Sequence, residues 1–120
     1  MEKAEENLAA AKICFQNGLY NACANRAYYA AFQAAKSTLA NRGIKKEKRT
    51  HKQVQAEFSG VLIRKRKVYP GRLKSYLMQM QIVRDRADYS ELNVNKKTAW
   101  RQLGKAEEMV TLIKREQGND

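Results

Sequence analysis

Apolar residues recur every three or four positions along most of the chain, which is the spacing of one face of an α-helix. In residues 2–17 this face consists of Ala4, Leu8, Ala11 and Phe15. Residues 20–40 carry a stripe of small residues, which permits close approach of another helix: Ala22, Cys23, Ala27, Ala30 and Ala34. Because glycine adopts the left-handed backbone conformation without strain, Gly18 and Gly43 are expected to end these helices. The pattern therefore predicts a helical hairpin.

Three more helices are predicted in the rest of the chain. Thr50 and Gln53 have the spacing of a capping box, and the apolar positions Val54, Phe58, Val61 and Leu62 follow them. After a turn at residues 69–71, a fourth helix should run to about Tyr89, and Asn93 or Asn95 should cap a fifth. No alternating strand pattern is present. The sequence therefore predicts an all-α, up-and-down bundle of about five helices, forming a single domain over residues 1–120.

Composition excludes several classes of protein. The chain has 120 residues, of which 43% are hydrophobic and 30% charged, as in an ordinary globular domain. No run of about 18 apolar residues is present and the N-terminus lacks a signal-peptide core, so no membrane association is expected. We expect a cytoplasmic protein in which Cys14 and Cys23 are free thiols, as small core residues rather than a redox pair. One histidine and two cysteines cannot build a zinc site alone, so no metal and no cofactor is expected.

Positive charge is concentrated in the middle of the chain. The net charge is +12, and residues 42–74, with twelve basic and two acidic residues, account for +10 of it. The basic residues form two clusters, which are Lys45, Lys46, Lys48, Arg49 and Lys52, and then Arg64, Lys65, Arg66 and Lys67. Such clusters bind the phosphates of RNA through charge, without reading its sequence. An acidic protein partner or a solvated connector would also account for them.

Polar residues within the predicted helices provide further candidate site residues. Arg84 and Asp88 are spaced i, i+4 near the end of the fourth helix, where they form a surface ion pair or a phosphate-binding arginine held by a carboxylate. In the second helix, Arg26 precedes Tyr28 and Tyr29. We expect Arg26 to be partly buried and to pair with Asp88, or with the neighbouring aspartate at position 85. The tyrosines are expected to pack in the core with bonded hydroxyl groups.

His51 is the only histidine, and it follows the predicted cap Thr50. The helix N-terminus and the flanking cations Arg49 and Lys52 disfavour the protonated ring, so the pKa of His51 should lie low enough to leave it neutral at neutral pH. A structural role at the start of the helix and a role as base or hydrogen-bond donor are both open.

Two stretches of the sequence resemble a known family. Residues 18–32, Gly-Leu-Tyr-Asn-x-x-x-Asn-Arg-Ala-Tyr-Tyr-Ala-x-Phe, are similar to the second-helix signature of the HEPN superfamily, and in particular of its short stand-alone prokaryotic branch. Thr50-His51 and Phe58 resemble that branch's third helix, and residues 84–89 resemble the end of its fourth helix. The resemblance covers roughly residues 4–115.

The resemblance implies a helical bundle that forms a homodimer. Many HEPN domains are metal-independent ribonucleases, in which an arginine and a histidine four to six residues later line a cleft shared by two copies. Short members are often encoded beside a minimal nucleotidyltransferase and form a toxin–antitoxin pair with it, and some are silenced by nucleotidylation of a tyrosine beside the catalytic histidine. Arg84 matches the catalytic arginine, but Asp88 and Tyr89 stand where the histidine would follow. An ionised aspartate is a weak base and cannot act as an acid. The resemblance therefore supports the family's fold for this chain more strongly than it supports ribonuclease activity.

Taken together, the residues and the resemblance predict a cytoplasmic HEPN homodimer that binds RNA or a nucleotide and acts with a minimal nucleotidyltransferase. Arg84 would bind phosphate and Asp88 would orient Arg84 or Arg26, with Tyr28, Tyr29, His51 and Tyr89 as supporting residues. The alternatives are an active ribonuclease toxin that uses Arg84 with Asp88 or His51, and a non-catalytic interaction module. A His51 nitrogen bonded to Arg84 or Asp88 would favour the ribonuclease, and a buried Arg26–Asp88 pair would favour the module.

Overall fold

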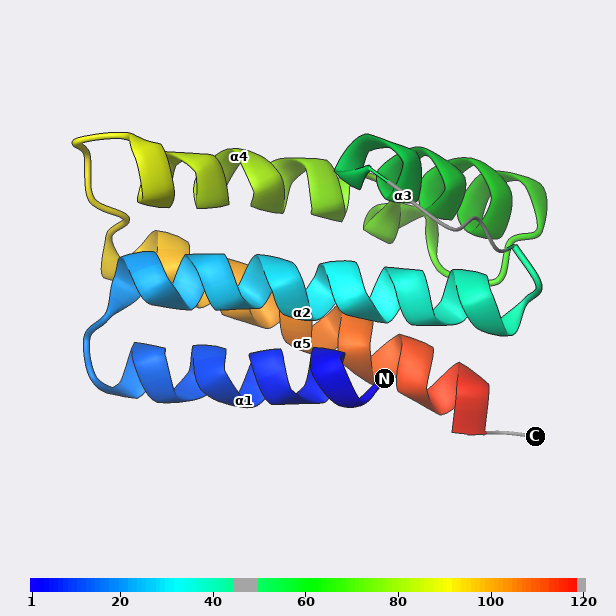
Figure 1. Cartoon of the computed structure of the whole chain (residues 1–120), viewed down its shortest axis with the longest axis horizontal. Coiled ribbons are helices and arrows are strands. Elements are labelled where there is room, and N and C mark those ends of the chain that lie inside the picture. Colours follow the sequence, from blue (N-terminus) through cyan, green and yellow to red (C-terminus); the bar gives the residue numbers. More distant parts are fainter. Residues whose placement is uncertain (45–49, 119–120) are drawn as a thin grey trace.

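Five α-helices form the bundle that the computed structural model describes for residues 1–44 and 50–118 (Figure 1). They are α1 (Glu2–Gln16), α2 (Tyr20–Asn41), α3 (His51–Glu57), α4 (Tyr76–Tyr89) and α5 (Lys96–Gly118). A π-helical segment, η1 (Phe58–Lys65), continues α3, and a 3₁₀ segment, η2 (Gly71–Ser75), precedes α4. No strand occurs in the described ranges. The prediction of an all-α bundle of about five helices is confirmed.

The predicted helix ends are set by local backbone chemistry. Gly18 and Gly43 adopt φ values of +73° and +75°, which a residue with a side chain rarely takes. Thr50 Oγ1 accepts the backbone N–H of Gln53 at 3.1 Å, and Gln53 Oε1 accepts the N–H of Thr50 at 3.0 Å, so the capping box is complete. Asn95 Oδ1 caps α5 by accepting the N–H of Thr98 at 2.8 Å. The predicted capping box and the Asn95 cap are therefore confirmed.

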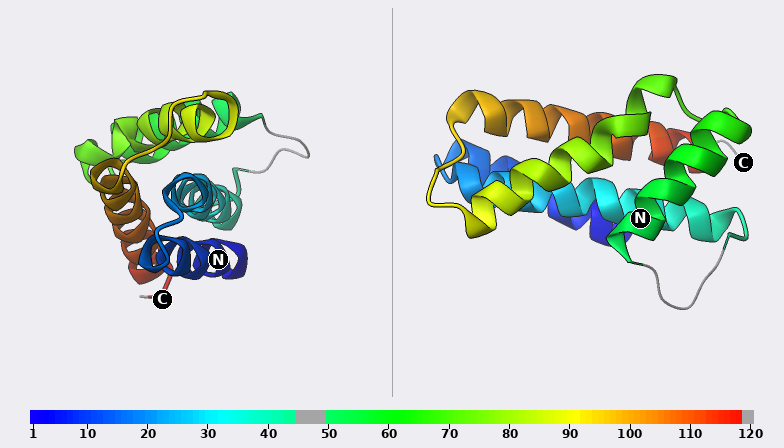
Figure 2. Two further views of the ribbon diagram at one scale, coloured as in Figure 1. Left: turned by 90° about the vertical axis from the view of Figure 1, so that its left-hand side faces the viewer. Right: turned by 90° about the horizontal axis from the view of Figure 1, so that it is seen from above.

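Helix α2 is the centre of the bundle, because it packs against α1, α5 and α4. Viewed along the bundle (Figure 2, left), α2 lies between α4 and α1, with α5 closing one side. Its fully or almost fully buried alanines allow these neighbours to approach closely, and they are Ala24, Ala27, Ala30, Ala31, Ala34 and Ala35. Of the predicted stripe of small residues, Cys23, Ala27, Ala30 and Ala34 are buried and place α2 inside the fold, whereas Ala22 is exposed.

Two departures from the predicted helices lie between residues 58 and 75. The third helix changes to i+5 hydrogen bonding after Glu57, and the N–H of Arg66 donates to the carbonyl of Val61 at 2.8 Å. This spacing buries Phe58 together with Ile63, while Val61 is only half-buried. The fourth helix starts as a 3₁₀ turn, with its α-helical part beginning at Tyr76. A hydrophobic period near 3.6 residues does not distinguish these variants of the helix.

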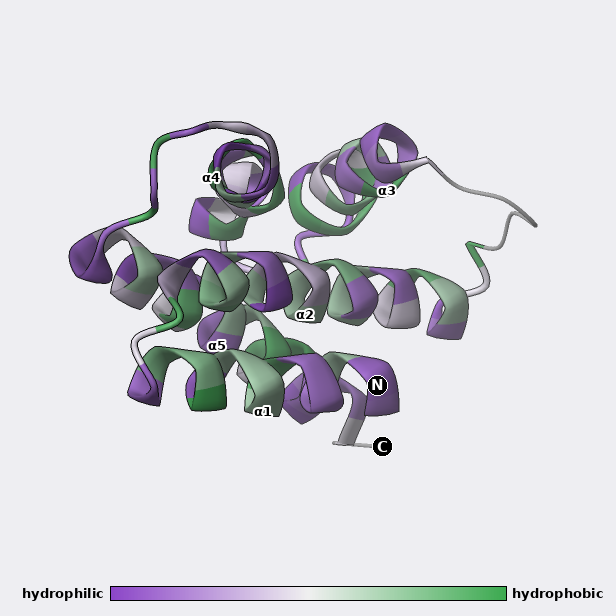
Figure 3. Ribbon diagram, turned by 60° about the vertical axis from the view of Figure 1, so that its left-hand side comes forward, coloured by the Kyte–Doolittle hydropathy of each residue, from purple (hydrophilic) through white to green (hydrophobic). Residues whose placement is uncertain are grey.

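Each helix carries hydrophobic and hydrophilic positions, as Figure 3 shows. The core includes Tyr28, Phe58, Leu62, Leu73 and Met109, all fully buried. Cys14 and Cys23 are free cysteines, as predicted, and Cys23 is a buried core residue. Burial, with a smaller contribution from Cys14, raises the pKa of Cys23 to about 11, so its thiol stays protonated. Within the described part of the chain, every helix is too short or too polar to cross a bilayer.

Candidate functional site: a tyrosine, histidine and arginine cluster

Three helices bring Tyr28, His51 and Arg84 together. Tyr28 comes from the middle of α2, His51 from the first turn of α3, and Arg84 from the second half of α4. The Tyr28 hydroxyl forms a 2.7 Å hydrogen bond with His51 Nδ1, and the imidazole stacks on Phe32 with ring centroids 4.3 Å apart. Gln55 Nε2 lies 3.5 Å from the same hydroxyl. The orientation of the imidazole is therefore fixed on two sides.

Arg84 lies over the two tyrosines of α2. Its guanidinium carbon is 5.9 Å from the ring centroid of Tyr28 and 5.3 Å from that of Tyr29, which is the range of cation–π contacts. Arg84 Nε donates to Asp88 at 3.2 Å, and Nη1 donates to Asp85 at 3.2 Å. The predicted pair of Arg84 and Asp88 is therefore formed. Nη2 has no partner among the residues that the structure describes, so it can still donate to a ligand.

The predicted pair of Arg26 with an aspartate is wrong. Arg26 Nε donates to Asn25 Oδ1 at 2.8 Å, and Nη1 donates to Asn7 Oδ1 at 3.0 Å. Asp88 instead accepts from Asn25 Nδ2 at 3.0 Å and from Arg84. Because Arg26 is only half-buried, amide oxygens suffice and no carboxylate is needed. Its guanidinium also lies 5.2 Å from the ring centroid of Tyr29.

The charges around the cluster set the protonation states. Burial lowers the pKa of His51 below its ordinary value of 6.5, and the nearby cations Arg84 and Lys36 lower it further, while Asp85 acts in the opposite direction. The predicted direction is thus confirmed, but burial is the largest cause, and the contributing cations are Arg84 and Lys36 rather than the flanking Lys52. Burial raises the pKa of Tyr28 to about 12, so its hydroxyl keeps its proton at neutral pH. The cluster therefore presents a neutral imidazole beside a charged guanidinium.

Neither of the two arrangements that would separate the alternatives is formed. No hydrogen bond joins His51 to Arg84 or Asp88 in the described part of the chain, and Nδ1 bonds to the Tyr28 hydroxyl instead. Nε2 of His51 has no partner within that part. The Arg26–Asp88 pair expected of a purely structural module is missing as well. His51 and Arg84 nevertheless share the same tyrosine, which the sequence alone did not indicate.

The first basic cluster lies before α3 and in its first turn, and the second cluster lies beyond the end of α3. Arg64, Lys65, Arg66 and Lys67 are all exposed, and none of the four has an acidic partner within the described ranges. Lys52 is also exposed. Lys45, Lys46, Lys48 and Arg49 lie outside the described residues. The exposed cations are therefore available to a polyanion.

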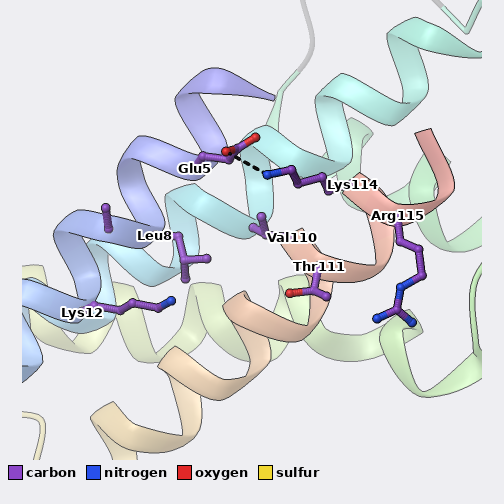
Figure 4. A pocket seen from close by; sticks show the side chains of 8 residues that line it. Glu5, Leu8, Lys12, Val110, Thr111, Lys114 and Arg115 are labelled. Carbon is purple, nitrogen blue, oxygen red and sulfur yellow. Dashed lines mark hydrogen bonds and ion pairs between the residues drawn. The ribbon is translucent and has the colours of Figure 1, made fainter. Parts of the chain in front are cut away.

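A separate cavity of about 430 Å³ lies between α1 and α5 (Figure 4). Glu5 and Lys114 form a 3.3 Å ion pair across it, and Lys12 pairs with Glu107 at 3.6 Å. Leu8 and Val110 line it with apolar surface. Because its lysines are already paired and it has no histidine, this cavity is a weaker candidate than the cluster around Tyr28.

Comparison with known proteins agrees with the fold. A family model described as HEPN domain matches residues 1–117. The chain belongs to the HEPN family. A stretch of 48 residues of this HEPN protein is 50% identical to a protein of Methanocaldococcus jannaschii that is named "Putative toxin MJ0605". The match covers 40% of this chain and 36% of the relative, so the chain spans about a third of the curated relative that it matches.

Sequence reasoning missed several residues of the cluster. Asn25 was not assigned a role, and Asp85 was named only as a possible partner of Arg26 and not of Arg84; each of them stands directly beside a predicted residue. Gln55 follows His51 by one helical turn and gave no signal of its own. Tyr89, in contrast, is 78% exposed and does not support the cluster by packing.

Proposed function

We propose that this HEPN protein is the RNA-binding, toxin-type member of a toxin–antitoxin pair, with a minimal nucleotidyltransferase as its partner. The Methanocaldococcus jannaschii relative with the name "Putative toxin MJ0605" supports the first part. The resemblance to short stand-alone HEPN proteins supports the second part. The observation that carries RNA binding is the convergence of a guanidinium and a neutral imidazole on Tyr28.

Arg84 is suited to hold a phosphate group. Its side chain is only 15% exposed, and Asp85 and Asp88 hold two of its three nitrogens in place. Burial alone would lower the pKa of Arg84, but Tyr29, Asp88 and Asp85 outweigh it and raise the pKa, so the guanidinium stays charged. Nη2 is then left to donate to a phosphate oxygen in a preorganised direction. The exposed cations of residues 64–67 would attract the rest of the RNA strand.

Ribonuclease activity is a second candidate, favoured by the position of His51. Cleavage without a metal requires a base that takes the proton of the ribose 2′-hydroxyl and an acid that protonates the leaving oxygen. In the tautomer whose Nδ1–H donates to the Tyr28 hydroxyl oxygen, Nε2 is left to accept that proton, and the imidazolium so formed would then return it to the leaving oxygen. In this mechanism His51 would act in place of the histidine that is missing after Arg84.

The homodimer is proposed to form through the exposed side of α4. Met78 and Ile82 are spaced i, i+4, and they are 55% and 58% exposed. Two large apolar side chains at this spacing form a stripe that a second copy of the same helix covers in a symmetric interface. The stripe lies on the helix that carries Arg84, so such a dimer would hold two arginines on one assembly.

One experiment separates the candidates. Labelled single-stranded RNA is mixed with the purified protein and a metal chelator, and binding and cleavage are followed in parallel for the wild type, His51→Gln and Asp88→Asn. Binding without cleavage supports the first candidate. Metal-independent cleavage that His51→Gln abolishes and Asp88→Asn retains supports the second. A wild-type protein that binds no RNA at low salt contradicts both.

A further inference from the structure

An exposed tryptophan lies at the N-terminal end of α5. This helix carries no residue of the Arg84 cluster. Trp100 is 62% exposed, and its ring centroid lies 5.3 Å from that of Phe15 in α1. Together with Lys96 and Lys97, these two aromatic residues line a shallow surface cavity of about 550 Å³. Most of the indole is therefore open to solvent, although Phe15 supports it.

The polar groups of this cavity are all positively charged. Lys96 and Lys97 are exposed, and neither has an acidic partner among the described residues. Arg101, the next residue after Trp100, is likewise exposed and unpaired in that part of the chain. The positive end of the α5 dipole adds to this field, because Lys96 and Lys97 are the first two residues of the helix. The cavity thus offers a ring face and ammonium groups side by side.

We propose that Trp100, Phe15, Lys96 and Lys97 form a base-stacking site for single-stranded RNA. A base has a flat π-face that stacks on indole, and its phosphates accept from ammonium groups, which is how proteins bind single strands without sequence preference. A protein partner would need about 800 Å² of surface on this chain, whereas a cavity lined by four side chains suits one base and its phosphates. The inference rests on the proposed RNA binding and adds a second contact to it.

The site is built from α1 and α5, whereas Tyr28, His51 and Arg84 come from α2, α3 and α4. Helix α5 begins after the connection from α4, at the end of the molecule where α1 turns into α2 (Figure 1). Phe15 also contacts Tyr20, the first residue of α2, with ring centroids 5.7 Å apart. Asn21, the next residue, donates to Asn93 just before α5 at 3.1 Å. These contacts fix the aromatic pair on the rigid corner of the hairpin.

Trp100 is the only tryptophan of the chain, so its fluorescence reports on this cavity alone. The probe is a 2′-O-methyl oligoadenylate of about 12 nucleotides, which has no free 2′-hydroxyl and falls in the range of single-strand site sizes. Binding is measured by the anisotropy of a labelled probe, and stacking by the quenching of Trp100. The variants are Trp100→Ala and Lys96→Gln/Lys97→Gln. Matched controls are Leu92→Ala, an equally exposed apolar side chain, and Lys3→Gln/Arg115→Gln.

The proposal predicts that the probe quenches Trp100 saturably, and that Trp100→Ala weakens binding by about 5- to 100-fold, as expected for the loss of one stacked base. The lysine double variant should lower the slope of log affinity against log salt by about 1.4, because each phosphate contact to a single strand contributes about 0.7. The controls should bind like the wild type.

The proposal is overturned if the probe binds while Trp100 fluorescence and the Trp100→Ala affinity stay unchanged, which would leave the proposed function intact. A synthetic acidic peptide is tested in the same way. If the peptide quenches Trp100 while the RNA binds without quenching it, the patch belongs to a protein partner and the proposal is overturned. An absence of any RNA binding in the anisotropy measurement would contradict the proposed function itself.

Discussion

Replacing Tyr28 by phenylalanine removes one hydroxyl group and keeps the aromatic ring in the core. Tyr28 is fully buried, and its hydroxyl forms the 2.7 Å hydrogen bond that holds His51. Tyr69→Phe is the matched control, because Tyr69 is 5% exposed and its hydroxyl forms a 2.7 Å hydrogen bond with Thr38. Each variant thus loses one buried hydroxyl, but only Tyr28 contacts the cluster.

Tyr69→Phe should cost at least as much stability as Tyr28→Phe, because the Tyr69 hydroxyl also donates to the Glu116 carboxylate at 3.3 Å. Loss of a hydrogen bond between uncharged groups costs about 1 kcal/mol, and rather more where a buried partner stays unpaired. For 120 residues, an unfolding entropy of about 2.1 cal/mol/K per residue converts 1 kcal/mol into a Tm shift of about 4 °C. Thermal unfolding followed by circular dichroism should therefore show Tm values lowered by about 4–8 °C in both variants.

The variants should differ in RNA binding. Without the Tyr28 hydroxyl, the imidazole of His51 keeps its stacking on Phe32 but loses the hydrogen bond that orients it. A loss of about 0.7–1.4 kcal/mol in binding free energy would weaken RNA binding by about 3- to 10-fold. Tyr69→Phe should bind like the wild type, because its hydroxyl bonds to Thr38 and Glu116, away from the cluster. Equal RNA affinities of the two variants, with Tyr28→Phe folded, would refute the role of the Tyr28–His51 pair.

Three further predictions concern pH, salt and assembly. In the folded protein the pKa of His51 lies below 6.5, so its contribution to stability is complete above pH 6.5 and declines below it, where the unfolded chain gains a proton. Urea unfolding from pH 7.5 to 5 should therefore show a steeper loss of stability in the wild type than in His51→Gln, and parallel curves would contradict this. Replacing all four cations of residues 64–67 by glutamine should lower the salt slope of RNA binding by up to about 3 without unfolding the bundle, and an unchanged slope would remove these residues from the binding surface. Light scattering should give about twice the chain mass of 13.8 kDa for the wild type and a monomer for Ile82→Asp, whereas a wild-type monomer at every concentration would exclude the dimer.

The fold was predictable because the hydrophobic period marks the helices and several helix ends have a local signal. Gly18 and Gly43 take left-handed conformations that glycine favours, and Thr50 with Gln53 forms a capping box within four residues. The π-helical segment from Phe58 was not predicted, since its i+5 bonding depends on which side chains the core accepts rather than on hydrophobic period.

The candidate site was only partly predictable. Arg84 and Asp88 share one helix face, so their pairing follows from spacing alone. The contact of His51 with Tyr28 joins residues 23 positions apart, and it depends on how α3 docks on α2. The wrong partner for Arg26 has the same origin, because burial and the nearby amides of Asn7 and Asn25 emerge only in the folded chain.

The most direct test of the account compares Arg84→Ala with Arg86→Ala in RNA binding. Both changes remove one positive charge from α4, but Arg86 is exposed and has no acidic partner within the described residues, while Arg84 belongs to the cluster. Arg84→Ala should weaken binding of single-stranded RNA by about 1.5–3 kcal/mol, the range for a hydrogen bond to a charged group, and Arg86→Ala by less than about 0.5 kcal/mol. Equal losses in the two variants, both folded, would contradict a phosphate site at Arg84.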